Sequence, residues 1–246
     1  MLRNLLNHRS APDVGWPVVE EGALRLSRNP GTGSRYRGRV LISDSHRFLF
    51  VHVQKTGGST IDNGLTAALG DVRRIPAANR HAPLDRLLQL EPGLADYWTA
   101  GFVRNPWARM VSWWRMMERF RDGAAEGIER YVDHLQRNRF VAGIIEKHPD
   151  FESFVMHAPD DHPRLRKPQV AFLNNDMKRA DFTGRQESLE ADLHRIYDHL
   201  GLEWVGLKSV NIDPGRPDYR DLYTETTRKR VAELFEPDLR EYGYEF

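Results

Sequence analysis

The chain has 246 residues, with 36 Lys and Arg against 35 Asp and Glu, 40% hydrophobic residues and no cysteine. This length suits one domain with a real core, because single cores commonly grow to about 250 residues before chains split. A formal net charge of +1 argues against nucleic acid as a partner, and the lack of cysteine excludes disulfides, thiolate metal sites and cysteine nucleophiles. No window approaches the ~18 apolar residues that a membrane span needs. We therefore expect a soluble, cytoplasmic protein without membrane insertion; the composition leaves its oligomeric state open.

The first half of the chain predicts a strand, a glycine turn and a helix. Residues 1–46 are rich in Pro, Gly, Arg and Ser, so we expect an N-terminal arm of loops and edge elements there. The run 48–53 is apolar on both faces, as in a strand buried within a parallel sheet. Gly57 and Gly58 interrupt it. A helical stripe then precedes the expected C-cap at Gly70, at positions Ile61, Leu65, Ala68 and Leu69.

A second unit repeats this order. Residues 99–103 form a short apolar strand, Asn105 is a good N-cap, and Pro106 suits the first helical position. A buried helical stripe is expected to follow at Trp107, Met110, Val111, Trp114 and Met117.

The alternation of strands and helices predicts the fold class. A further strand is expected at 181–185, with helices after it. The charged stretch 119–168 has helical character and no strand signal, so we expect a helical insertion or lid. We predict an α/β domain over 47–246, of the P-loop three-layer type, with a central, mainly parallel sheet flanked by helices.

The segment between the first strand and its helix is a candidate anion-binding loop. Backbone N–H groups at a helix N-terminus are unsatisfied donors, and glycines allow an anion to approach them. Lys55 adds a charge, and three residues add hydroxyls: Thr56, Ser59 and Thr60. The lysine precedes the glycines, so this is not a Walker A loop. A plain strand-to-helix turn with a solvated lysine is the alternative.

The second strand ends in another candidate anion-binding group. Arg104 stands at its C-terminal end, where ligands of open α/β sheets collect, and Ser112 follows two helical turns later. The spacing allows both to reach one anion. The alternative is that the Arg-Asn-Pro string only caps the helix.

The two strings together resemble the sulfotransferase family that uses 3′-phosphoadenosine 5′-phosphosulfate (PAPS), in the branch that contains the heparan sulfate 2-O- and 6-O-sulfotransferases and bacterial relatives. Residues 50–60 match the hallmark F-x-H-x-x-K-T-G-G-[ST]-[ST], and residues 104–112 match R-[ND]-P-[WY]-x-R-x-x-S. Two more strings are similar to family segments, DFTGRQESLEADL and NIDPGRPDYRDLY.

The resemblance implies roles for individual residues. The first loop would hold the 5′-phosphosulfate end of the donor through Lys55, Thr56, Gly57, Gly58, Ser59 and Thr60. Arg104 and Ser112 would hold the 3′-phosphate. Residues near the C-terminus could border the adenine nucleotide, namely Asn211, Arg216 and Tyr219.

The family also places a histidine base between its two donor motifs, and His81 occupies that place. His81 would take the proton of the acceptor hydroxyl while Lys55 stabilises the charge that builds on the leaving phosphate. His52, on the buried strand, is the competing candidate and is interpreted as a core histidine. We expect no metal requirement, since a lysine and backbone donors suffice for the less charged sulfuryl group.

The acceptor is expected to be a hydroxylated carbohydrate or small metabolite. Trp113 and Trp114 cannot share one helical face, so one should face another layer or a sugar. Trp113 is therefore a candidate acceptor contact, as is Gln169, which lies in a string similar to the family's [RK]-P-Q. Basic residues could line a cleft for an anionic acceptor or form a solvated face: Arg115, Arg119, Arg121, Arg137, Arg139, Arg164, Arg166 and Lys167.

Two other functions remain open from the sequence. A kinase-like P-loop phosphotransferase would depend on ATP and Mg²⁺. A non-catalytic nucleotide-binding module would keep the cradle without the chemistry.

Overall fold

The computed structural model describes residues 40–206 and 217–246. At its centre lies a sheet with the strand order β1 (Leu41–Ser43), β2 (Phe48–Val51), β3 (Trp98–Val103) and β4 (Phe182–Arg185). β2, β3 and β4 are parallel, and β1 runs antiparallel to β2 at the edge. The sheet therefore extends into the segment expected to be an N-terminal arm.

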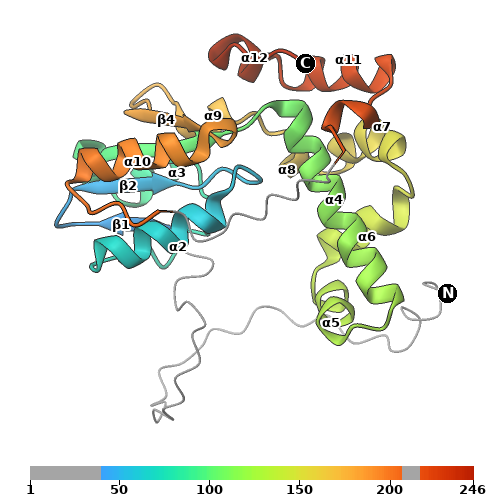
Figure 1. The fold of residues 1–246 in the computed structure, drawn as a ribbon, viewed down its shortest axis with the longest axis horizontal. Coiled ribbons are helices and arrows are strands. Elements are labelled where there is room, and N and C mark those ends of the chain that lie inside the picture. Colours follow the sequence, from blue (N-terminus) through green and yellow to red (C-terminus); the bar gives the residue numbers. More distant parts are fainter. Residues whose placement is uncertain (1–39, 207–216) are drawn as a thin grey trace.

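Helices cover both faces of this sheet (Figure 1). On one face, α2 (Gly58–Leu69) and α10 (Leu189–Leu200) pack against alternate residues of β2, Phe48 and Phe50. On the other, α3 (Leu84–Leu90) and α9 (Val170–Leu173) pack against Leu49 and Val51. Burial on both faces explains why this strand is apolar throughout. The predicted α/β fold with a mainly parallel central sheet is confirmed.

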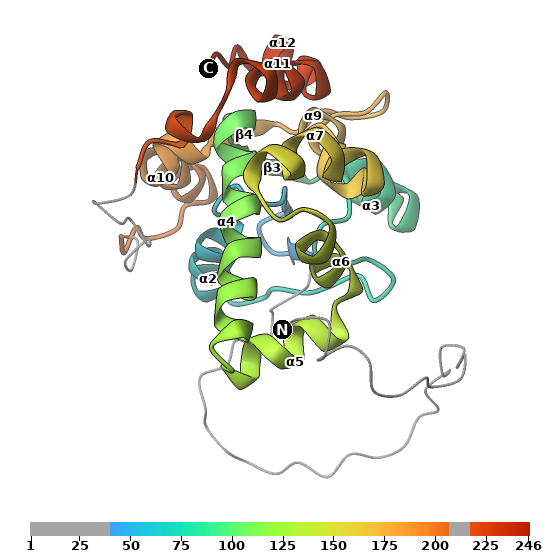
Figure 2. The same ribbon diagram turned by 90° about the vertical axis from the view of Figure 1, so that its right-hand side faces the viewer.

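A layer of helices stands beside the sheet domain (Figure 2). The long helix α4 (Pro106–Ala125) packs against α5 (Glu129–Arg137), α6 (Arg139–Lys147), α7 (Phe151–Asp161) and α11 (Glu225–Leu234). The short helix α8 (Pro163–Arg166) packs against α7. No residue between 119 and 168 is in a strand. The predicted helical insertion is therefore present. The short elements η1 (Pro92–Asp96), η2 (Gln186–Ser188), η3 (Tyr219–Leu222) and α12 (Glu236–Tyr242) complete the fold.

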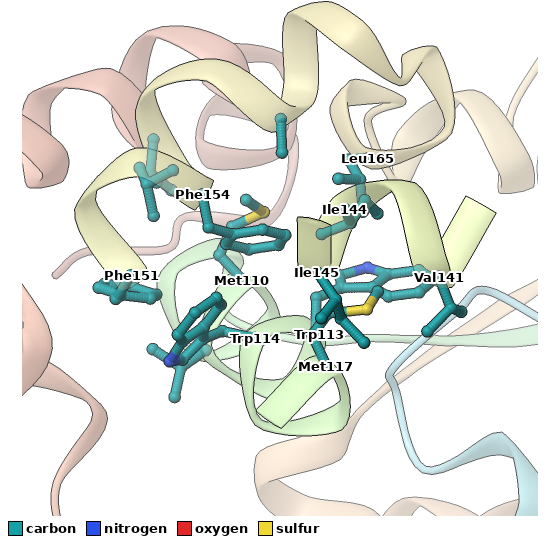
Figure 3. Close-up of a cluster of buried hydrophobic side chains, with 14 of the residues drawn as sticks. Met110, Trp113, Trp114, Met117, Val141, Ile144, Ile145, Phe151, Phe154 and Leu165 are labelled. Atoms are coloured by element: carbon teal, nitrogen blue, oxygen red, sulfur yellow. The ribbon is translucent and has the colours of Figure 1, made fainter. Parts of the chain in front are cut away.

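The two tryptophans of α4 pack in different directions within this layer (Figure 3). Trp114 packs against Phe151 and Phe154, at ring-centroid distances of 6.3 and 5.6 Å. Trp113 lies edge-on to Phe140 of α6 at 6.0 Å. Both tryptophans are buried. Trp113, which lies outside the apolar stripe of α4, therefore packs into a second layer of side chains.

Asn105 fixes the start of α4 directly after β3. Its side-chain oxygen accepts hydrogen bonds from the N–H groups of Trp107 and Ala108, and Pro106 occupies the first turn. This cap places the N-terminus of the longest helix at the carboxyl end of the sheet.

The Asn105→Ala variant should lose about 1 kcal/mol of stability, because two amide donors lose their acceptor. For a chain of this size, that loss corresponds to a decrease in Tm of about 2 to 4 °C. Thermal unfolding followed by circular dichroism measures it. Asn105→Ser, which keeps a capping oxygen, is the control; equal losses in both variants would show that the cap is not the source.

Candidate active site

The candidate site is a cavity of about 540 Å³ at the carboxyl ends of β2 and β3. Loops at this edge of a parallel sheet and the N-termini of the following helices commonly bind ligands. Among the described residues, the charged side chains that line the cavity are all cationic: Lys55, Arg80, Arg104, Arg115, Arg119 and Arg164. This lining favours an anionic ligand.

The loop between β2 and α2 has a backbone shaped for close approach. Lys55 has φ 71° and Gly57, the N-cap of α2, has φ 84°. The ring of His52 lies against Gly58, where a Cβ would be 1.9 Å from Nε2 of His52. Glycine is thus required at 58 by contact and at 57 by conformation.

Five of the six expected loop residues line the cavity, and Thr56 does not. The Thr56 hydroxyl donates to the carbonyl oxygen of Val53 at 2.9 Å, and its side chain is buried. Its role is to close the turn beneath the loop. This is a correction to the expectation that its hydroxyl faces the anion.

The two predicted anion-binding groups open into the same cavity. Nη1 of Arg104 lies 3.4 Å from the carbonyl oxygen of Lys55. The ammonium of Lys55 lies over the ring of Trp113, 5.7 Å from its centroid. Ser112 and Tyr219 line the cavity as well. The other two residues expected near the nucleotide, Asn211 and Arg216, lie outside the described residues.

His81 also lines the cavity and has a defined tautomer. Its Nδ1 lies 3.1 Å from the carbonyl oxygen of His52, so Nδ1 carries the proton and Nε2 keeps its lone pair. Burial, followed by the neighbouring His52, Arg80 and Arg164, lowers the pKa of His81 to about 3. The imidazole is therefore neutral at pH 7 and able to accept a proton.

His52 is a buried residue beside His81. Its Nδ1 lies 3.2 Å from Oδ2 of Asp62, and its ring packs edge-on against that of His81 at 4.6 Å. Burial lowers the pKa of His52, which agrees with its interpretation as a core histidine.

A buried polar network beneath the cavity was missed from the sequence. Arg109 is 1% exposed; its Nε donates to the carbonyl oxygen of Gln54 at 3.0 Å. Burial lowers the pKa of Arg109 to about 10, so it stays charged at neutral pH. The buried carboxylate of Asp238 lies nearby and opposes that effect. Arg109, the second arginine of the motif at residues 104–112, therefore supports the loop between β2 and α2.

Gln169 belongs to this network and lies below the cavity wall. Its side chain accepts from the N–H of Arg104 at 2.9 Å and donates to the carbonyl oxygen of Arg104 at 2.7 Å. The backbone N–H of Gln169 donates to Asp238 at 2.9 Å. Because Gln169 is fully buried and does not line the cavity, the expected acceptor contact is replaced by a clamp on Arg104.

Aromatic rings line the end of the cavity formed by α4, α5 and α6. Phe120 stacks on His134 at 4.2 Å, and the guanidinium of Arg164 lies 5.0 Å from the ring centroid of Phe140. Of the eight basic residues considered for an acceptor cleft, those that line the cavity are Arg115, Arg119 and Arg164. Those that do not are Arg121, Arg137, Arg139, Arg166 and Lys167.

Fold and site together define an α/β protein of the P-loop type with a cationic cavity at the carboxyl edge of its sheet. The chain belongs to the sulfotransferase family, whose model matches residues 38–245. It is 27% identical over 217 residues to carbohydrate sulfotransferase 14 of Danio rerio; the match covers 81% of this chain and 56% of that protein. The match thus spans just over half of the relative's length. No solved structure matches the chain significantly.

The expectation of a cytoplasmic protein is wrong, because the similarity is to a carbohydrate sulfotransferase. A count of apolar residues tells whether a segment can cross a bilayer and does not identify a compartment. In residues 40–206 and 217–246, every helix is too short or too polar to span a membrane. No group of three His, Cys, Asp or Glu in the same residues could hold a metal ion.

Replacement of Gln169 by leucine should destabilise the protein by about 2 to 4 kcal/mol, since it leaves the buried N–H and carbonyl of Arg104 without partners. Urea unfolding monitored by tryptophan fluorescence gives this value. The exposed Gln136 of α5 offers a matched control, and Gln136→Leu should stay within about 0.5 kcal/mol of the parent protein. Similar unfolding midpoints for both variants would contradict the clamp.

Proposed function

We propose that this protein transfers the sulfuryl group of PAPS to an acceptor hydroxyl and releases adenosine 3′,5′-bisphosphate. One observation carries the proposal: the loop after β2 and the arginine after β3 open into one cavity whose described charged residues are all cationic. Membership of the sulfotransferase family supports the class of reaction.

The donor is expected to lie across the two motifs. Lys55 and the N–H groups at the start of α2 suit the 5′-phosphosulfate end, because helix N-termini bind anions. Arg104 and Ser112 suit the 3′-phosphate. Tyr219, which lines the cavity, is proposed to border the nucleotide. The same role is proposed for Asn211 and Arg216 from the family resemblance.

The transfer needs a base on the acceptor side and positive charge on the leaving side. Nε2 of His81 accepts the proton of the acceptor hydroxyl while the oxygen of that hydroxyl forms a bond to sulfur. The bond between sulfur and the bridging phosphate oxygen breaks, and its electron pair stays on the bisphosphate. Lys55 and the loop amides stabilise that charge, so the proposal requires no metal ion.

The acceptor we propose is a hydroxylated carbohydrate. The relative is a carbohydrate sulfotransferase, and this chain places aromatic and cationic groups side by side in the cavity. Trp113 and Phe140 offer apolar ring surfaces, and Arg164, close to both, offers hydrogen-bond donors.

Adenosine 3′,5′-bisphosphate should stabilise the protein, whereas ATP with Mg²⁺ should have little effect. At about 100 times its Kd, a ligand adds about 2.7 kcal/mol, which corresponds to an increase in Tm of about 5 to 10 °C here. Differential scanning fluorimetry measures the shift. Arg104→Ala and Lys55→Ala should abolish most of it.

The control is Arg137→Ala, because Arg137 is exposed and pairs with Asp133 away from the cavity. It should keep the full shift. An equal or larger response to ATP with Mg²⁺ would favour a phosphotransferase. A shift with the bisphosphate but no sulfotransfer to any hydroxylated acceptor would favour a binding module.

The His81→Ala variant should lose about 10²- to 10⁴-fold in kcat while it keeps donor binding, as expected for removal of a positioned base. In the parent enzyme, the lowered pKa of His81 keeps the base form populated in acid. From pH 8 to 5, kcat/KM should therefore stay nearly level. A base with a pKa of about 6.5 would lose about 30-fold over that range. Such a loss in the rate profile would contradict the assignment.

A further inference from the structure

Asp62 is an acidic residue that no sequence motif singles out. It lies in the second turn of α2, just after the glycine loop. One carboxylate oxygen, Oδ2, contacts Nδ1 of His52 at 3.2 Å, Nε of Arg80 at 2.7 Å and Nη2 of Arg80 at 2.5 Å. The side chains of His52, Asp62 and Arg80 are only 6%, 15% and 18% exposed. Such a partly buried, shared carboxylate holds its partners more firmly than a surface ion pair.

The segment that carries His81 depends on this carboxylate for its position. Residues 76–83 form turns and loops between α2 and α3. Within the segment, Asn79 accepts the N–H of His81 at 2.8 Å. Arg80 connects the segment to α2 through Asp62, and more weakly through the carbonyl of Gly58 and the hydroxyl of Ser59, both at 3.4 Å.

Asp62 also fixes the second support of His81. The carbonyl of His52 accepts Nδ1–H of His81, and the two rings are in edge contact. The contact of Asp62 with Nδ1 of His52 holds that ring between α2 and His81. One carboxylate thus anchors both the residue before His81 and the residue that sets its tautomer.

We propose that Asp62 is the positioning residue of the base: it holds Arg80 and His52 so that His81 presents the lone pair of Nε2 to the acceptor hydroxyl. The inference rests on the proposed function for its consequence in catalysis. Its structural part, the tautomer and placement of the His81 ring, can be measured without donor or acceptor.

The test is the Asp62→Asn variant, which keeps the size of the side chain and removes its charge. We expect kcat to fall by about 10- to 100-fold, since small misplacement of a reacting group has effects of that order. The Kd for adenosine 3′,5′-bisphosphate should change by less than about threefold, because Asp62 does not line the cavity.

Nitrogen-15 NMR of the histidine rings provides the readout that does not depend on activity. The spectrum of His81→Gln identifies the His81 signals. The parent protein should show a single Nδ1–H tautomer for His81, and Asp62→Asn should show a mixture. Arg80→Gln removes the same ion pair from the other side and should give the same mixture of His81 tautomers. The double variant should show no larger change in tautomer than either single variant.

Glu91→Gln is the matched control. Glu91 forms an ion pair with Arg73, and neither residue lines the cavity. It should leave kcat and the His81 tautomer unchanged.

An unchanged tautomer and unchanged kcat in both Asp62→Asn and Arg80→Gln would overturn the proposal. So would a loss of bisphosphate affinity that matches the loss of kcat, because Asp62 would then serve the donor cradle. If the parent protein showed no sulfotransfer activity but Asp62→Asn still changed the His81 tautomer, the proposed function would be refuted. Asp62 would remain the residue that positions His81.

Discussion

The amide groups at the start of α2 are the constraint on which the site depends. The first N–H groups of a helix have no carbonyl partners within it, and here they stand at the edge of the sheet beside Lys55. The backbone turns through positive φ at Lys55 and Gly57, which shapes the loop in front of these amides. The lack of a side chain at Gly58 leaves room for the ring of His52. Any larger residue at Gly58 would displace a histidine that supports the proposed base.

The core beneath the cavity holds its two motifs in a fixed relation. Arg109 reaches the carbonyl of Gln54, and Gln169 holds both backbone groups of Arg104. Asp238, from the C-terminal helix α12, accepts from Gln169 and stabilises the charged form of Arg109. Buried groups of this kind are tolerated only when their hydrogen bonds are made. The packed interior therefore sets the distance between the two proposed anion-binding motifs.

Local patterns predicted much of this structure, and long-range contacts explain what they missed. The strand at Phe48–Val51 and the cap at Asn105 depend on neighbouring residues, so composition and spacing were sufficient. The contact between Gln169 and Asp238 joins residues 69 positions apart, and a glutamine on its own gives no signal of burial. Thr56 was misplaced because the turn directs its hydroxyl inward, which residue type alone does not reveal.

A crystal structure with adenosine 3′,5′-bisphosphate tests the central claim most directly. The account predicts the 5′-phosphate within hydrogen-bond distance of Lys55 and the first amides of α2, with the 3′-phosphate on Arg104 and Ser112. It also predicts Nε2 of His81 facing the 5′ side, with its Nδ1 still on the carbonyl of His52. A nucleotide bound elsewhere, or one whose two phosphates avoid these groups, would contradict it.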